Sequence, residues 1–179
     1  MAGDVNTPGT INESHAFVET AVARHQAPLL RYATRLLHGD ADRARDVVQD
    51  TFVKLLAQKP ADVEGHLAEW LFTVCRNRAL DVLRKEGRMK FFEEGQAERL
   101  TTAEPLPGAG AERAEAQAAV LKLIERLPRN QQEVVRLKFQ NGFSYKEISR
   151  ITSLSVTNVG FILHTAVARL RKEMAAQAD

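Results

Sequence analysis

The chain has 179 residues, of which 27% are charged and 44% hydrophobic, and its formal net charge is +2. These values are ordinary for a soluble globular protein and provide apolar side chains for one or two compact domains. The polar, acidic N-terminus predicts no signal peptide, and the lack of any run of about 18 apolar residues predicts no membrane span. The single cysteine, Cys75, lies in an apolar helical pattern, so we expect a buried thiol in a reduced, cytoplasmic protein.

The charge is distributed unevenly along the chain. Residues 1–22 carry a net charge of −3, residues 23–90 carry +4, residues 91–118 carry −4 and residues 119–179 carry +5. Two basic segments separated by an acidic connector indicate two contacts with a polyanion rather than one diffuse patch.

Two helices are predicted first. One covers residues 17–38, with a kink expected at Pro28, and ends at Gly39. The next begins at an N-cap, Asp40, and stops at Pro60.

The second of these helices has an apolar and an acidic face. Its apolar positions have i, i+4, i+7 spacing, which is typical of a side that packs inward; they are Val48, Phe52 and Leu55. Its polar face consists of Asp42, Asp46, Gln49 and Asp50. Acidic helix faces are usually only solvated, so the spacing alone leaves a partner-binding role open.

The third predicted helix, within residues 65–90, carries a basic stripe. Its inward side is expected to contain Leu67, Leu71, Val74 and Cys75, with Trp70 and Phe72 also in the core. The stripe consists of Asn77, Arg84 and Arg88, with Arg76, Arg78 and Lys85 beside it. Such cations can neutralise phosphates or simply keep an exposed helix soluble, and the spacing favours neither.

Residues 91–111 are predicted to form a flexible linker. The segment is acidic, places prolines and glycines together between positions 105 and 110, and lacks apolar periodicity. The segments on either side lack the alternation of strands. We therefore predict an all-α chain of two small helical domains, residues 13–90 and 112–176, with a disordered segment before residue 13.

The second domain begins with two predicted helices, one stopping before Pro128 and one ending at Asn141 and Gly142. Ser144 and Glu147 then form an S-x-x-E capping box, so a short helix is expected to start there.

A three-residue turn at 152–154 follows, and Ser155 is expected to cap the last helix. The inward face of that helix consists of Val159, Leu163, Ala166 and Leu170. A short helix, a tight turn and a long amphipathic helix predict a helix-turn-helix, although helical hairpins without DNA function have a similar pattern.

Two parts of the chain resemble a known family. The stretch LPRNQQEVVRLKFQNGFSYKEISRITSLSVTNVGFILHTAVARLRKEM resembles region 4 of bacterial RNA polymerase sigma factors of the extracytoplasmic-function (ECF) group, in the sigma-70 superfamily. The stretches RARDVVQDTFVKLLAQ and HLAEWLFTVCRNRALDVLRKEGR resemble region 2 of the same family, in the same order and at the same distance. The resemblance implies a sigma factor that binds core RNA polymerase and directs promoter recognition, DNA melting and transcription initiation.

For the first domain, the resemblance implies two contact surfaces. The residues expected to bind core polymerase are Asp46, Gln49, Asp50 and Phe52. A loop at residues 59–66 and the helix after it correspond to the place where the family captures an unstacked base of the minus-10 element. The residues expected to contact minus-10 DNA are Lys59, His66, Asn77, Arg78, Arg84, Lys85 and Arg88. Backbone contacts and a base pocket would offset the cost of opening the duplex, without nucleotide hydrolysis.

For the second domain, the resemblance implies that the last helix reads the minus-35 element. The residues expected to contact it are Arg136, Lys146, Ser155, Thr157, Asn158, Phe161, Thr165 and Arg169, with Lys138 and Arg171 as further phosphate contacts. The helix departs from the family pattern, which commonly has Lys or Arg and small polar residues at positions 160–162 and Gly at position 153. Asn can pair with adenine and apolar groups can contact a thymine methyl, so we expect this helix to read DNA with fewer charges.

Several alternatives remain open from the sequence. Phe161 and Ile162 would instead form an exposed apolar patch that binds a protein, such as an anti-sigma factor or an activator. A helix-turn-helix repressor, or a helical adaptor that does not bind polymerase, would explain part of the pattern. An enzyme is not expected, because the five histidines are scattered and no metal-ligand or phosphate-loop motif occurs; no cofactor, metal or small-molecule substrate is expected either.

Overall fold

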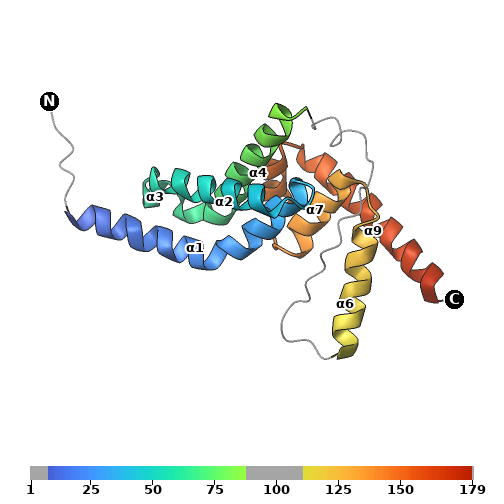
Figure 1. The fold of residues 1–179 in the computed structure, drawn as a ribbon. Helices are drawn as coiled ribbons and strands as arrows, with labels where there is room; N and C mark the ends of the chain where they lie inside the picture. Colours follow the sequence, from blue (N-terminus) through green and yellow to red (C-terminus); the bar gives the residue numbers. More distant parts are fainter. Residues whose placement is uncertain (1–7, 88–110, 179) are drawn as a thin grey trace. The chain divides into compact units, whose positions relative to one another are not determined.

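The computed structural model describes residues 8–87 and 111–178, with side chains over 14–87 and 117–176. Every regular element in these ranges is a helix (Figure 1). The chain divides into two compact units after Glu86, and each unit is described by itself. The predicted linker, residues 91–111, lies outside the described residues apart from Ala111.

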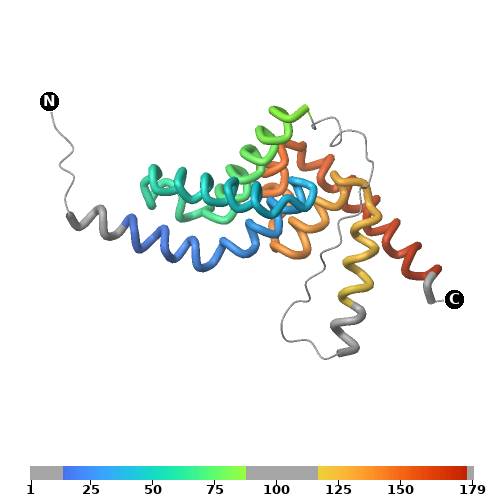
Figure 2. The backbone as a smooth tube through the Cα atoms, viewed as in Figure 1, coloured from blue at the N-terminus to red at the C-terminus, as the bar shows by residue number. Residues whose placement is uncertain are grey.

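The first unit is a bundle of three long helices with a short helical connection. Its elements are α1 (Pro8–Leu36), α2 (Ala41–Leu56), α3 (Pro60–Val63), the 3₁₀ helix η1 (Glu64–His66) and α4 (Leu67–Lys85). The helices α1, α2 and α4 pack against one another in every pairing. Figure 2 follows the chain from α1 into α2 and then through the short connection into α4.

The core of this unit is largely apolar, with Thr51 as a fully buried polar side chain. Its fully or almost fully buried side chains include Leu29, Ala33, Leu36, Val47, Val48, Leu55, Leu71, Cys75, Ala79 and Leu83. The rings of Tyr32 and Phe72 meet in a tilted arrangement with centroids 5.0 Å apart. The prediction for Cys75 is confirmed, since the thiol is buried and its burial raises its pKa to about 12.

Two predictions for the first unit are corrected. The helix expected at 17–38 begins at Pro8, so α1 includes residues 8–12, which were expected to be disordered, and it contains Pro28 in its interior. The loop expected at 59–66 is mostly helical, because Pro60 begins α3 and η1 leads directly into α4. Proline is favoured in the first turn of a helix, where its missing N–H costs nothing, and the buried Val63 anchors this turn to the core.

The second unit consists of α6 (Ala111–Ile124), α7 (Arg129–Phe139), α8 (Tyr145–Thr152) and α9 (Val156–Ala178). The helices α7, α8 and α9 pack against one another, and α6 contacts α9. Its apolar core includes Leu123, Leu127, Val134, Val135, Leu137, Phe143, Ile148, Ile151, Val159, Ile162, Leu163 and Ala166.

The helix-turn-helix is confirmed at α8 and α9. The backbone N–H of Ser144 donates to Glu147 Oε2 at 2.7 Å, and the N–H of Glu147 donates to Ser144 Oγ at 3.3 Å, so the capping box is complete. Ser153 ends α8 in the left-handed conformation, with φ 61° and ψ 24°. Ser155 Oγ accepts the N–H of Asn158 at 3.1 Å and caps α9, so the turn occupies 153–155, one residue later than predicted.

Within the described ranges, no single helix is long and apolar enough to cross a membrane, and α8 and α9 meet that criterion only when counted together across a bend of 105°.

Candidate nucleic-acid and protein interfaces

The outward face of α2 combines acidic, polar and apolar side chains. Asp46 and Gln49 are exposed, as predicted for a contact surface. Val53 and Leu56 continue the same face at helical spacing and are 56% and 49% exposed. Phe52 is only 9% exposed and packs in the core, so its predicted contact with polymerase is not supported. We call Asp46, Gln49, Val53 and Leu56 the α2 face.

Asp50 and Arg78 were assigned to different partners, yet the structure pairs them with each other. Arg78 Nη2 of α4 donates to Asp50 Oδ2 of α2, and the two side chains are 34% and 46% exposed. This hydrogen bond to Asp50 raises the pKa of Arg78 above its usual value. A residue of the predicted polymerase contact therefore holds a residue of the predicted DNA contact.

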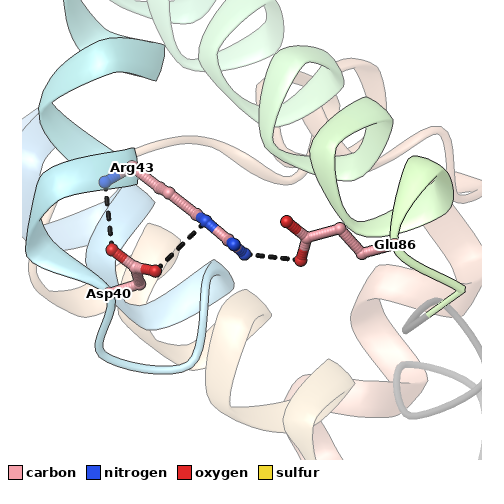
Figure 3. Close-up of polar contacts among 3 residues, drawn as sticks. All are labelled: Asp40, Arg43 and Glu86. Carbon is pink, nitrogen blue, oxygen red and sulfur yellow. Dashed lines mark hydrogen bonds and ion pairs between the residues drawn. The ribbon is translucent and has the colours of Figure 1, made fainter.

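A second ion pair joins the same two helices (Figure 3). Arg43 Nη1 of α2 lies 2.5 Å from Glu86 Oε2, just after α4, and its Nε lies 3.2 Å from Asp40 Oδ2. Asp40 also accepts the N–H of Arg43 at 3.0 Å and so caps α2. Arg43 thus ties the start of α2 to the end of α4.

The basic stripe of α4 is largely accessible. Asn77, Arg84 and Lys85 are exposed, and Arg84 Nη1 lies 3.0 Å from Asp81 Oδ1 of the preceding turn. Lys59, which precedes α3, and His66, the last residue of η1, are exposed as well. The remaining predicted residue, Arg88, lies outside the described residues.

The first two turns of α9 present uncharged side chains to solvent. Thr157 and Asn158 are exposed, Phe161 is 68% exposed, and Thr165 is half-buried. Ile162 is only 7% exposed, so the apolar patch proposed from Phe161 and Ile162 together does not exist on this surface. We call Thr157, Asn158, Phe161 and Thr165 the reading face.

Gly160 lies between two members of the reading face. A Cβ built there would lie 3.7 Å from Cε2 and 3.9 Å from Cδ2 of Tyr145, which is ordinary van der Waals contact. Its φ is not positive, so the backbone does not require glycine either. Nothing within the described part of the unit therefore explains a glycine in this helix.

The cations around the reading face differ in accessibility. Lys146 and Arg171 are exposed, and Arg169 Nε lies 3.5 Å from Glu173 Oε1. Arg136 is only 6% exposed, which leaves its guanidinium little surface for the predicted phosphate contact. Lys138 is half-buried, with its ammonium 5.5 Å from the centre of the Tyr145 ring.

Sequence reasoning missed three surface features. Val53 and Leu56 extend the α2 face, and their spacing from Asp46 could have revealed them. Tyr145 is 41% exposed beside Gly160, and His164 is exposed one turn after Phe161. Helical spacing from Phe161 was sufficient to find His164, whereas only the packing of α8 on α9 reveals Tyr145.

The fold and these surfaces define an all-α protein whose second unit is a helix-turn-helix of the DNA-binding type, with a cationic helix in its first unit. Each unit matches the sequence model of a protein family. Residues 21–89 match the sequence model of "Sigma-70 region 2", and residues 117–170 match that of "Sigma-70, region 4".

Curated relatives of this chain are named RNA polymerase sigma factors. The chain is 32% identical over 144 residues to the ECF RNA polymerase sigma factor EcfG of Rhodopseudomonas palustris, covering 80% of this chain and 77% of that protein. It is 29% identical over 160 residues to the RNA polymerase sigma factor YlaC of Bacillus subtilis, covering 88% of this chain and 91% of that protein.

Solved structures share the fold. The sigma factor RpoE of Bartonella quintana, crystallised with the anti-sigma factor NepR, superposes with a TM-score of 0.63 at 24% identity, covering 88% of this chain and 96% of that one. CnrH, solved with the cytosolic domain of CnrY, gives a TM-score of 0.57, covering 93% of this chain and 97% of that one. The chain belongs to the ECF family of RNA polymerase sigma factors. It is therefore a transcription initiation factor and not an enzyme.

Proposed function

We propose that each unit performs a different part of sigma-factor function. The first unit, predicted at residues 13–90, binds core RNA polymerase and minus-10 DNA. The second, predicted at residues 112–176, reads the minus-35 element. The observation that carries this division is the reading face of α9, which is exposed on a capped helix-turn-helix and uncharged over its first two turns.

The α2 face supplies the contact with polymerase. Val53 and Leu56 provide apolar area at its C-terminal end, while Asp46 and Gln49 provide charge and hydrogen-bonding groups. Interfaces gain most of their affinity from such buried apolar anchors and gain orientation from the charges around them.

The stripe on α4 holds the separated non-template strand of the minus-10 element. Asn77, Arg84 and Lys85 are exposed along one helix, so they can follow a phosphate backbone. Lys59 begins the helical connection and His66 ends it, and a base that leaves the stack would be bound there. The free energy of these contacts offsets the few kcal/mol that unstacking costs.

The reading face discriminates bases by shape and hydrogen bonding. The carboxamide of Asn158 can pair with both polar atoms on the major-groove edge of adenine, and the ring of Phe161 can contact a thymine methyl. Lys146, Arg169 and Arg171 supply phosphate contacts, which fix the position of the helix without reading sequence. Ser155 contributes by capping α9.

The protein acts in the cytoplasm, where core polymerase and promoter DNA are found. An anti-sigma factor is a candidate third partner, because one solved structure of this fold is a sigma factor in complex with an anti-sigma factor. A protein-binding role for the first turns of α9 rests on Phe161 alone, since Ile162 is buried.

Run-off transcription from a pool of randomised promoters tests the proposal, with purified bacterial core RNA polymerase in the presence and absence of the full chain. We expect the enriched templates to contain two sequence blocks, near minus 35 and minus 10. Enrichment of the minus-10 block alone would assign α9 to a protein partner. No transcription would overturn the proposal in favour of a repressor or adaptor.

A further inference from the structure

The seam between α2 and α4 carries two ion pairs with opposite polarity. Near the start of α2 the cation is on α2 and the carboxylate follows α4, in the pair Arg43–Glu86. About two turns further along α2 the carboxylate is on α2 and the cation on α4, in the pair Asp50–Arg78.

The two ion pairs differ in whether their residues also lie at a proposed contact surface. Arg43 and Glu86 belong to neither surface of the proposed function. Asp50 borders the α2 face, and Arg78 borders the cationic stripe of α4. One pair therefore only joins two helices, while the other connects a protein contact to a DNA contact.

The environment of Arg78 favours release. Only Nη2 of its guanidinium donates to Asp50, and its Nε is enclosed without a hydrogen-bond partner. Both side chains of the pair are partly exposed, and exposed ion pairs are weak. A cation from another protein that approaches Asp50 can therefore displace Arg78 at small cost.

We propose that Asp50 and Arg78 form a latch that lowers the affinity of the free chain for single-stranded minus-10 DNA, and that core polymerase opens this latch by binding Asp50. The latch rests on the proposed function, because it requires Asp50 to face polymerase and Arg78 to face the non-template strand. By linkage, opening the latch with polymerase strengthens DNA binding, and DNA that binds Arg78 strengthens polymerase binding by the same factor.

The test compares two substitutions that each remove one negative charge and one ion pair from the same seam. Asp50→Asn frees Arg78, whereas Glu86→Gln removes the ion pair that joins Arg43 to the end of α4 and leaves both Arg78 paired with Asp50 and Arg43 paired with Asp40. Fluorescence anisotropy measures the affinity of the full chain for a fluorescein-labelled single-stranded oligonucleotide that carries the minus-10 block enriched by transcription. Each variant is measured as the free chain and with saturating core polymerase, and thermal unfolding verifies that each is folded.

We expect Asp50→Asn to raise the affinity of the free chain about two- to fivefold above that of Glu86→Gln, which is the range of one exposed ion pair. The gain should vanish in the presence of polymerase and in the double variant Asp50→Asn/Arg78→Gln. An undetectable gain, an equal gain in Glu86→Gln, or a gain that persists with polymerase would overturn the latch.

Failure of the latch is distinguishable from failure of the proposed function. If the wild-type chain supports transcription from two-block promoters but Asp50→Asn shows no gain, the latch alone is wrong. If the wild-type chain supports no transcription with core polymerase, the proposed function is wrong and the latch has no partner to open it.

Discussion

The two units place their charges differently. In the first unit, cations and carboxylates of α2 and α4 form ion pairs with one another, and the predicted contact residues Asp50 and Arg78 are one such pair. In the second unit, α9 presents two turns without a charged side chain, and the cations lie around them. We therefore expect electrostatic affinity and base discrimination to reside on different surfaces.

The net charge of a unit therefore does not indicate how that unit recognises DNA. Phosphate contacts supply affinity that depends on salt and carries little sequence information, whereas base-edge contacts discriminate. A reading face without Lys or Arg is consistent with DNA recognition when residues around it, such as Lys146 and Arg171, provide the cations.

The largest expected effect comes from a substitution in the apolar part of the α2 face. Leu56→Asp should weaken holoenzyme formation by about 2 kcal/mol or more, because a charge replaces an apolar anchor of the interface. The affinity of core polymerase for the labelled full chain measures this loss. Met174→Asp is the matched control, since Met174 is also 49% exposed but lies on the second unit. Equal losses in both variants would remove the α2 face from the interface.

The next largest effect tests whether α9 reads bases of the upstream block. Asn158→Ala should cost about 1–3 kcal/mol of discrimination at one base pair of the upstream block, because a bidentate contact is lost. Selection from randomised promoters with the variant should show one relaxed upstream position and an unchanged minus-10 block. A uniform loss across all templates would mean that Asn158 supports folding or phosphate binding instead.

A smaller effect concerns Gly160. Gly160→Ala should stabilise the chain by about 0.5–1 kcal/mol, because alanine is the better helix former and its Cβ has room beside Tyr145. If glycine serves close approach of DNA to α9, the same variant should bind minus-35 promoters more weakly. Ala168→Gly, an exposed position two turns later, is the control and should lose stability without affecting promoter binding. Unchanged promoter binding by Gly160→Ala would exclude close approach.

The smallest effect is a pH dependence at the start of α8. Hydrogen bonds from the hydroxyl and backbone of Ser144 lower the pKa of Glu147 below its usual range. A carboxylate with a lowered pKa stabilises the fold at neutral pH, and this contribution is lost as pH falls through the pKa of the folded state. Glu147→Gln should therefore reduce the free energy of unfolding by only roughly 0.3 kcal/mol at pH 7, since the side chain is partly exposed and solvent weakens the interaction. Denaturant unfolding should show this difference disappearing in acid, and a difference that persists would assign it to side-chain shape.

Local sequence signals predicted the starts of α2, α8 and α9, but not those of α1 and α3. The caps at Asp40, Ser144 and Ser155 are all present, because a cap depends on residues within one turn. The inward position of Phe52 was also available from its spacing with Val48, although the family resemblance assigned it to a partner.

Other features depend on packing between helices and could not be predicted. Arg136 lies in an unbroken run of buried residues in α7, from Glu133 to Leu137. Consecutive helical positions point in all directions, so the middle of α7 is enclosed, although Asn130 and Phe139 near its ends are exposed. An amphipathic pattern does not show such enclosure. The pairing of Asp50 with Arg78 depends on the register of two antiparallel helices, and the sequence of either helix alone does not reveal that register.

The burial of Cys75 makes the native chain convenient for labelling. Thiolates react with maleimides and disulfides, and a thiol whose pKa is about 12 stays protonated near neutral pH. Because Cys75 is the only cysteine, a second cysteine placed on the reading face or the α2 face would be modified selectively without first replacing the native one. Fluorophores attached in this way would report the encounter of each unit with its partner in an otherwise wild-type sigma factor.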